Sequence, residues 1–104
     1  MPIAVFHQGY QGNNTLWCTQ YDSADAPGAW SQDTPVEPPG GLDLSFSPAA
    51  VNWLGGVSVF HQGWNSDVDT DGQIWYTYSP DGKQWGADTS VDVGMSGSPS
   101  CVVV

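Results

Sequence analysis

The chain has 104 residues, the size of a single domain, and 39% of them are hydrophobic, which is enough for a packed core. Eleven acidic residues stand against one Lys or Arg, so the formal net charge is -10. Phosphate backbones and anionic lipids are both bound through Lys and Arg, so this composition argues against nucleic-acid binding and against a membrane partner. The acidity favours a solvated, self-repelling surface instead.

The elements of the chain, taken in order, occur twice. The stretch VFHQG at residues 5–9 recurs letter for letter at residues 59–63. Three further runs follow each copy in the same order: TLWCTQY, WSQDTPV and SFSPAAVNW after the first, and QIWYTYS, WGADTSV and SGSPSCVVV after the second. The period of about 50 to 58 residues lies within the range of propeller-blade repeats. We place repeat one at about 3–51 and repeat two at about 57–104, within a single segment spanning 1–104.

Each repeat has the pattern of four short strands. Alternating, β-branched and aromatic residues mark the strands, and Gly, Pro, Asn and Asp separate them. The pair Asp81–Gly82 in SPDGKQW is a hairpin signal, because Gly supplies the positive φ of a tight turn. Eight strands without a helical period predict an all-β fold, either a sandwich, a barrel or a propeller. The length and the four-strand unit favour a β-propeller with two four-stranded blades per chain.

The phase of the repeat indicates how such a propeller is completed. The chain opens in the second strand of a unit, at 3–8, and closes with the first strand of the next unit, at 98–104. A lone chain would expose an apolar strand edge at each end, and such edges aggregate. We therefore expect a homo-oligomeric ring in which the last strand of one copy pairs with the first strand of the next. Three copies would give six blades and four would give eight, and a trimer is favoured. The alternative is that the chain is a piece of a longer repeat array.

These repeats resemble those of the PLL-type β-propeller lectins. The resemblance rests on VFHQG, on the W-Y/C-T strand, on W-x-x-D-T-x-V and on GMSGSPS-x-VV, and it covers nearly the whole chain. It implies a propeller that binds monosaccharides such as fucose or galactose derivatives. Lectins of this family usually carry many blades in one chain, whereas two-blade chains that trimerise are known among other sugar-binding propellers. The first repeat also departs from the pattern, because PVEPPGGLDLSFSPAA replaces the compact SVDVGMSGSPSCV.

The predicted sugar pocket lies between neighbouring blades, on the rim where both VFHQG strands end. Aromatic rings there would cover the C–H face of a sugar, and imidazole, amide and hydroxyl groups would bind its hydroxyls. Repeated weak sites around a ring would gain avidity through multivalent presentation. The opposing interpretation is that the tryptophans are core and the histidines only anchor loop backbone. We take Trp30 and Trp85 to be core residues between blades. The candidate ligand-binding residues are His61, Gln62, Trp64, Trp75, Ser96 and Ser98, with His7, Gln8, Tyr10 and Trp17 from the other repeat.

One acidic loop has the spacing of a calcium ligand set. Asp67, Asp69 and Asp71 in DVDTDG follow the D-x-D-x-D-G pattern that opens oxygen-lined calcium loops. The position at which such a loop places its bidentate glutamate is Tyr78, so a solvated acidic loop is favoured over a calcium site. No other cofactor is expected. A zinc site is disfavoured, because two histidines on separate blades have no cysteine near them.

An enzyme is not expected. Glycoside hydrolysis needs two carboxylates at a fixed separation, and the one glutamate, Glu37, lies in a Pro-rich loop. A sialidase would need arginines to hold its substrate, and the chain has none. The sequence thus favours a lectin, and the alternative is a structural or protein-binding repeat module. Cys18 and Cys101 are expected to be buried free thiols. No signal peptide or membrane span is visible, so we expect a soluble protein, with secreted and cytoplasmic locations both open.

Overall fold

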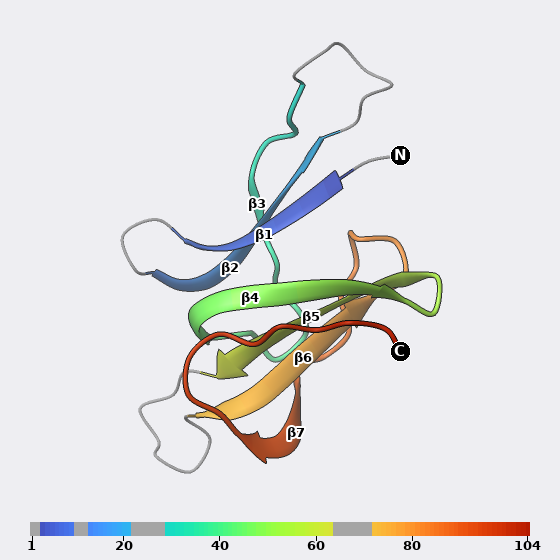
Figure 1. Ribbon diagram of the computed structural model, residues 1–104. Coiled ribbons are helices and arrows are strands. Elements are labelled where there is room, and N and C mark those ends of the chain that lie inside the picture. The colour runs from blue at the N-terminus through green and yellow to red at the C-terminus, as the bar shows by residue number, and fades with distance from the viewer. Residues whose placement is uncertain (1–2, 10–12, 22–28, 64–71) are drawn as a thin grey trace.

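The computed structural model describes residues 3–9, 13–21, 29–63 and 72–104, which form two antiparallel sheets (Figure 1). The first sheet has the order β1-β2-β3, and the second has the order β4-β5-β6-β7. No helix occurs within these ranges, so the predicted all-β class is confirmed. The strands are β1 (Ile3–Gly9), β2 (Asn13–Tyr21), β3 (Thr34–Pro35), β4 (Leu44–Trp53), β5 (Gly56–Gly63), β6 (Gln73–Ser79) and β7 (Thr89–Gly94).

Strands that follow one another in the chain are neighbours within each sheet. The first copy of VFHQG lies in β1, which is the first strand of its sheet. The second copy lies in β5, which is the second strand of its sheet. The strand in front of β5 is β4, and β1 has no such partner among the described residues. The repeat therefore has the predicted phase, with the first sheet one strand short.

The eighth expected strand is absent from the ranges described. The run SGSPSCVVV at 96–104 matches β4 in sequence, yet it contains no strand residue. β4 is a strand because it pairs with β5, from Trp53 opposite Gly56 to Leu44 opposite Gly63. The C-terminal run has no described strand beside it to complete a ladder, and unpaired backbone has no reason to adopt strand geometry.

The register places equivalent residues of the two repeats on equivalent rungs. His7 lies opposite Trp17, and His61 lies opposite Trp75. Directly opposed residues of antiparallel strands point to the same face, and their sequence neighbours point to the other. Each sheet therefore has one face that carries His and Trp and another that carries the Phe of VFHQG.

The core lies between the two sheets. Its buried members are Leu16 and Cys18 of β2, Val36 after β3, Leu44 of β4 and Val59 of β5. Because Cys18 is opposite Phe6, the Phe face of the first sheet is the one packed against the second. Val59 shares its side of β5 with His61, so the second sheet contributes its His face.

The two tryptophans expected in the core have different outcomes. The Trp85 ring meets the Phe6 ring edge to face across the sheets, with centroids 5.6 Å apart. Trp30, at the matched position of repeat one, is 52% exposed and packs on Tyr21 of its own sheet. Trp30 is therefore not buried within a single chain, because no second sheet among the described residues covers that side of the first.

The Asp81–Gly82 turn forms, although β7 does not begin directly after it. Gly82 has a φ of 76°, as the sequence predicted. The Asp81 carboxylate accepts hydrogen bonds from the amides of Lys83 and Gln84, at 2.8 and 3.0 Å. These hydrogen bonds stabilise the ionised carboxylate and hold the pKa of Asp81 below its ordinary value, and the bond from Gln84 has the larger effect. The strand resumes only at Thr89, so residues 80–88 make a compact loop instead of a two-residue hairpin.

Cys18 and Cys101 are free thiols, and only Cys18 is fully buried. Burial raises the pKa of both thiols. Cys101 is half-buried because the C-terminal segment lies at the surface, so the expectation of two buried thiols holds for one of them. Across the ranges that the structure describes, no helix is long and apolar enough to span a membrane.

Candidate functional site

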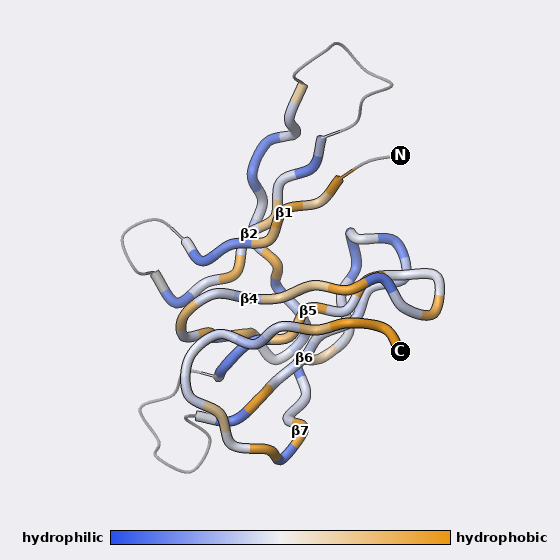
Figure 2. Tube along the Cα trace, in the orientation of Figure 1, coloured by the Kyte–Doolittle hydropathy of each residue, from blue (hydrophilic) through white to orange (hydrophobic). Residues whose placement is uncertain are grey.

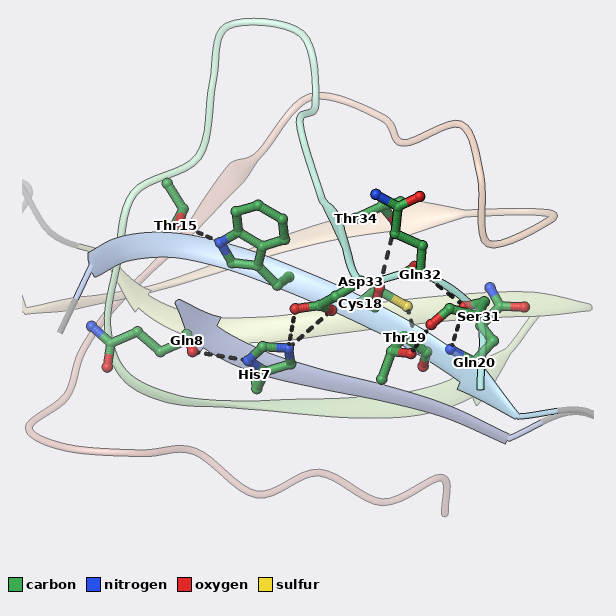
Figure 3. A network of polar contacts seen from close by, with 11 residues as sticks. His7, Gln8, Thr15, Cys18, Thr19, Gln20, Ser31, Gln32, Asp33 and Thr34 are labelled. Atoms are coloured by element: carbon green, nitrogen blue, oxygen red, sulfur yellow. Dashed lines mark hydrogen bonds and ion pairs between the residues drawn. The ribbon is translucent and has the colours of Figure 1, made fainter. Parts of the chain in front are cut away.

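Each repeat holds its histidine in the same pair of hydrogen bonds, shown for the first repeat in Figure 3. The His7 Nε2 atom lies 2.9 and 3.0 Å from the two carboxylate oxygens of Asp33, and its Nδ1 lies 2.9 Å from the carbonyl oxygen of Gln8. His61 has the same arrangement, with Asp88 at 2.9 and 3.0 Å and the Gln62 carbonyl at 3.1 Å. The W-x-x-D-T motif thus supplies the carboxylate that fixes the histidine of VFHQG.

The hydrogen bond with Asp33 raises the pKa of His7, since the carboxylate favours the protonated imidazole, and partial burial opposes the shift. The Nδ1 atom faces a carbonyl, which can only accept, so it carries a proton. Both ring nitrogens of each histidine are therefore engaged within the protein. In this arrangement the histidines tie the segment after β2 or β6 to the sheet, and they offer no nitrogen to a ligand.

Two further predicted site residues of repeat two, Gln62 and Ser98, are also hydrogen-bonded within the protein. Gln62 is buried, and its Oε1 accepts the Gly97 amide at 2.7 Å. Ser98 accepts the Ser47 amide through its Oγ at 3.0 Å. Ser96 is exposed. The predicted meeting of Gln62 with the Gly-rich loop therefore exists, and its bonds close the loop onto the sheet.

The two strand tryptophans are half-buried on the His faces. The Trp17 indole N–H donates to the Thr15 hydroxyl at 2.7 Å. The Trp75 indole nitrogen is buried and has no hydrogen-bond partner among the described residues. Gln8 is half-buried opposite Leu16, on the Phe face.

Five of the predicted residues lie outside the described ranges. They are Tyr10 and Trp64 of the sugar pocket and Asp67, Asp69 and Asp71 of the calcium loop. Within the described parts of the chain, no group of three or more His, Cys, Asp or Glu side chains is placed to hold a metal ion.

A hollow of about 540 Å³ opens between the two sheets, away from the histidines. This volume lies in the range of about 300 to 1,000 Å³ that is typical of ligand pockets. Its walls come from β2 and β3 with the segment between them on one side, and from the turn after β6 on the other. The lining residues are Cys18, Gln20, Ser31, Gln32, Thr34, Pro35, Val36, Gly82, Lys83 and Trp85.

The hollow combines an aromatic ring with neutral polar groups. Trp85 lies in the wall of the hollow, where its ring contacts the Phe6 ring. The Gln20 amide lies against Gly82 of the opposite wall. Ser31 is fixed by its hydroxyl, which accepts the Gln20 backbone N–H at 2.9 Å. Gln32 and Lys83 are exposed, and Lys83 is the one Lys or Arg of the chain.

None of the eight predicted sugar-site residues that the structure describes lines this hollow. A difference between two matched motifs could have pointed to the hollow. Repeat one has WSQDT where repeat two has WGADT, so Ser and Gln stand in place of Gly and Ala. Repeat two forms its sheet with Gly86 and Ala87 at these positions, so the shared fold does not require polar side chains there. Ser31 and Gln32 line the hollow. The hollow forms only where the two sheets pack together, so strand patterns alone did not locate it.

Comparison of the chain with protein-family models, with curated proteins and with solved structures gave no match.

Proposed function

We propose that the chain is a carbohydrate-binding protein that takes a monosaccharide, such as a fucose or galactose derivative, into the hollow between its sheets. The two sheets would be adjacent blades of a propeller, and further copies of the chain would complete the ring. The observation that carries the proposal is the lining of the hollow: one indole ring beside amide and hydroxyl groups.

A sugar ring presents an apolar C–H face and a rim of hydroxyls. Trp85 would cover the apolar face, and amide and hydroxyl groups can each donate to and accept from sugar hydroxyls. Gln20 and Gln32 supply the amides, and Ser31 and Thr34 supply the hydroxyls. A single Lys among these groups favours a neutral ligand over a strongly anionic one.

Binding without turnover fits the same lining. The residues that the structure places around the hollow include no carboxylate, whereas glycoside hydrolysis uses an acid and a second carboxylate across the scissile bond. The carboxylates of Asp33 and Asp88 are already engaged with histidines.

Calorimetric titration of fucose and galactose derivatives tests the proposal. Gln32→Met keeps the length of an exposed side chain and removes its amide, so it should weaken binding about tenfold, the equivalent of about 1.4 kcal/mol for a lost hydrogen bond. Trp85→Ala should abolish binding. Trp53→Ala, which truncates an exposed tryptophan outside the hollow, is the matched control and should bind normally.

Two results would count against a lectin. Absence of binding to every sugar on a glycan array would favour the structural or protein-binding module. Release of a product from a bound glycan would instead indicate a hydrolase. Binding that survives both hollow variants would place the sugar elsewhere, for example at the strand ends near His61.

A further inference from the structure

Among the described residues, nothing covers one edge and one face of the first sheet, and both are apolar in part. β1 is an edge strand, with Ile3 58% and Val5 40% exposed. At the matched positions of β5, Val57 is half-buried and Val59 is fully buried. β5 is covered because β4 pairs with its edge and the first sheet packs on its His face.

The C-terminal segment, 98–104, is an apolar run without a strand partner among the described residues. Val102, Val103 and Val104 are all exposed, and Figure 2 shows the hydrophobic colour concentrated at this end of the chain. The segment runs along the second sheet (Figure 1), where it borders Val51, Ser58 and Phe60 across a hollow of about 290 Å³.

The position of this segment matches the position of β4. β4 packs against β1 and β2, on the face of the first sheet that carries Phe6. The C-terminal segment lies on the face of the second sheet that carries Phe60, the equivalent residue. It therefore stands where the first strand of a following sheet would stand.

The first sheet of the same chain cannot be that following sheet. Its own first sheet packs on the Val59 side of β5, whereas the C-terminal segment lies on the Phe60 side. Adjacent strand residues point to opposite faces, so the second sheet lies between the segment and β1 of the same chain. β1 of the same chain therefore cannot reach the segment, whereas β1 of another copy can.

We infer that the C-terminal segment of one copy pairs antiparallel with β1 of a second copy, in the register that β4 and β5 show. Ala50 pairs with Val59 and Asn52 with Val57 in that ladder. The equivalent residues of the junction place Cys101 opposite Val5 and Val103 opposite Ile3. The inference specifies the partner of the proposed ring and its register, and it rests on the proposed blade arrangement but not on sugar binding.

The junction also accounts for the exposed Trp30. Within one chain, the Phe6 ring of the first sheet contacts the Trp85 ring of the second, with the two rings nearly perpendicular. Docking a second copy would bring its Trp30 to Phe60 in the same relation, because Trp30 and Trp85 hold matched positions. The same contact would cover the exposed His7–Asp33 pair, as the first sheet covers His61–Asp88.

Cysteine cross-linking tests the register. Cβ atoms of directly opposed residues lie about 4.5–5.5 Å apart, and their Cα separation falls within the range of disulfides. Val5→Cys with the natural Cys101 should therefore give covalent multimers with an added thiol oxidant. Peptide mapping should find the thiol introduced at position 5 joined to Cys101. Ala4→Cys, the adjacent exposed residue on the other face, is the matched control and should give few multimers.

A second pair makes the result independent of any one variant. This design combines Ile3→Cys and Val103→Cys in a chain that carries Cys101→Ser. It tests the same register at a pair two residues further along the strands. Predominant multimers from both designs support the inference. Chains that stay monomeric in both, equal cross-linking by Ala4→Cys, or a bridge that joins position 5 of one copy to position 5 of another would overturn it. Sugar binding within a single chain is unaffected by these outcomes, so the two proposals can fail separately.

Discussion

The His7–Asp33 and His61–Asp88 pairs have the same bond lengths and different surroundings. In each pair Nε2 lies 2.9 Å from the nearer carboxylate oxygen. The side chains of the first pair are 40% and 41% exposed, and those of the second are 0% and 8% exposed. Local sequence therefore sets the hydrogen bonds, and the neighbouring sheet sets their burial.

This difference separates what a repeat encodes within itself from what it obtains from its neighbour. The second sheet is flanked on its His face by the first sheet, and on its Phe face by the C-terminal segment. Among the described residues, the first sheet is flanked only on its Phe face. A buried hydrogen-bonded group depends on its partner more than an exposed one, because water cannot replace the lost bond where it is excluded.

The largest effect should come from removing the buried carboxylate. Asp88→Ala leaves the buried Nε2 of His61 without its hydrogen-bond partner, and we expect the free energy of unfolding to fall by about 3 kcal/mol. Asp33→Ala, the matched change in the exposed pair, should lower it by less than about 1 kcal/mol in the monomeric chain. Urea denaturation of both variants, at chain concentrations at which sedimentation shows monomers, measures the two values. Equal losses would mean that the exposure of the two pairs does not differ in solution.

A smaller effect is expected at the valine of VFHQG. Val59 is fully buried, so Val59→Ala removes core volume and should cost about 2 kcal/mol. Val5→Ala at the edge strand should cost less than about 0.5 kcal/mol in the monomeric chain. The same denaturation series measures both variants. A loss at Val5 comparable to that at Val59 would show that β1 is already covered in the monomer.

The smallest effect is a dependence on pH through His7. Its folded-state pKa is raised from the ordinary 6.5 by Asp33, so the stability that this pair contributes is complete below pH 6.5 and is lost as the pH rises through the folded-state pKa. We expect less than about 1 kcal/mol in total, because water screens the pair. An NMR titration of the His7 ring should give a pKa above 6.5, and Asp33→Asn should lower it. A His7 pKa at or below 6.5 would contradict the geometry of the pair.

The sequence predicted most of the strands from signals that act over short distances. Alternation and turn residues located β1, β2, β4, β5 and β6, because those signals act within a few residues. The short β3 and the loop before β7 were less visible, since the His–Asp bond and the core fix them from a distance. The terminal run 98–104 has strand composition without strand structure, which shows that β structure needs a partner as well as a pattern.

The candidate hollow shows the same limit. The sequence pointed to aromatic and amide groups, yet it assigned them to strand ends where His61 and Gln62 turn out to be bonded within the protein. Trp85 and Gln20 are far apart in the chain, and they line the same hollow only because the sheets pack. Residues that line a gap between sheets carry no periodic signal of their own.

The mass of the protein in solution tests the central claim most directly. If the uncovered sheet of one copy receives the C-terminal segment of another, sedimentation equilibrium at tens of micromolar chain should give three times the chain mass of 11.1 kDa, in a closed species that does not grow with concentration. A closed tetramer would keep the junction and change the blade number from six to eight. A chain that remains monomeric at every concentration would contradict the account.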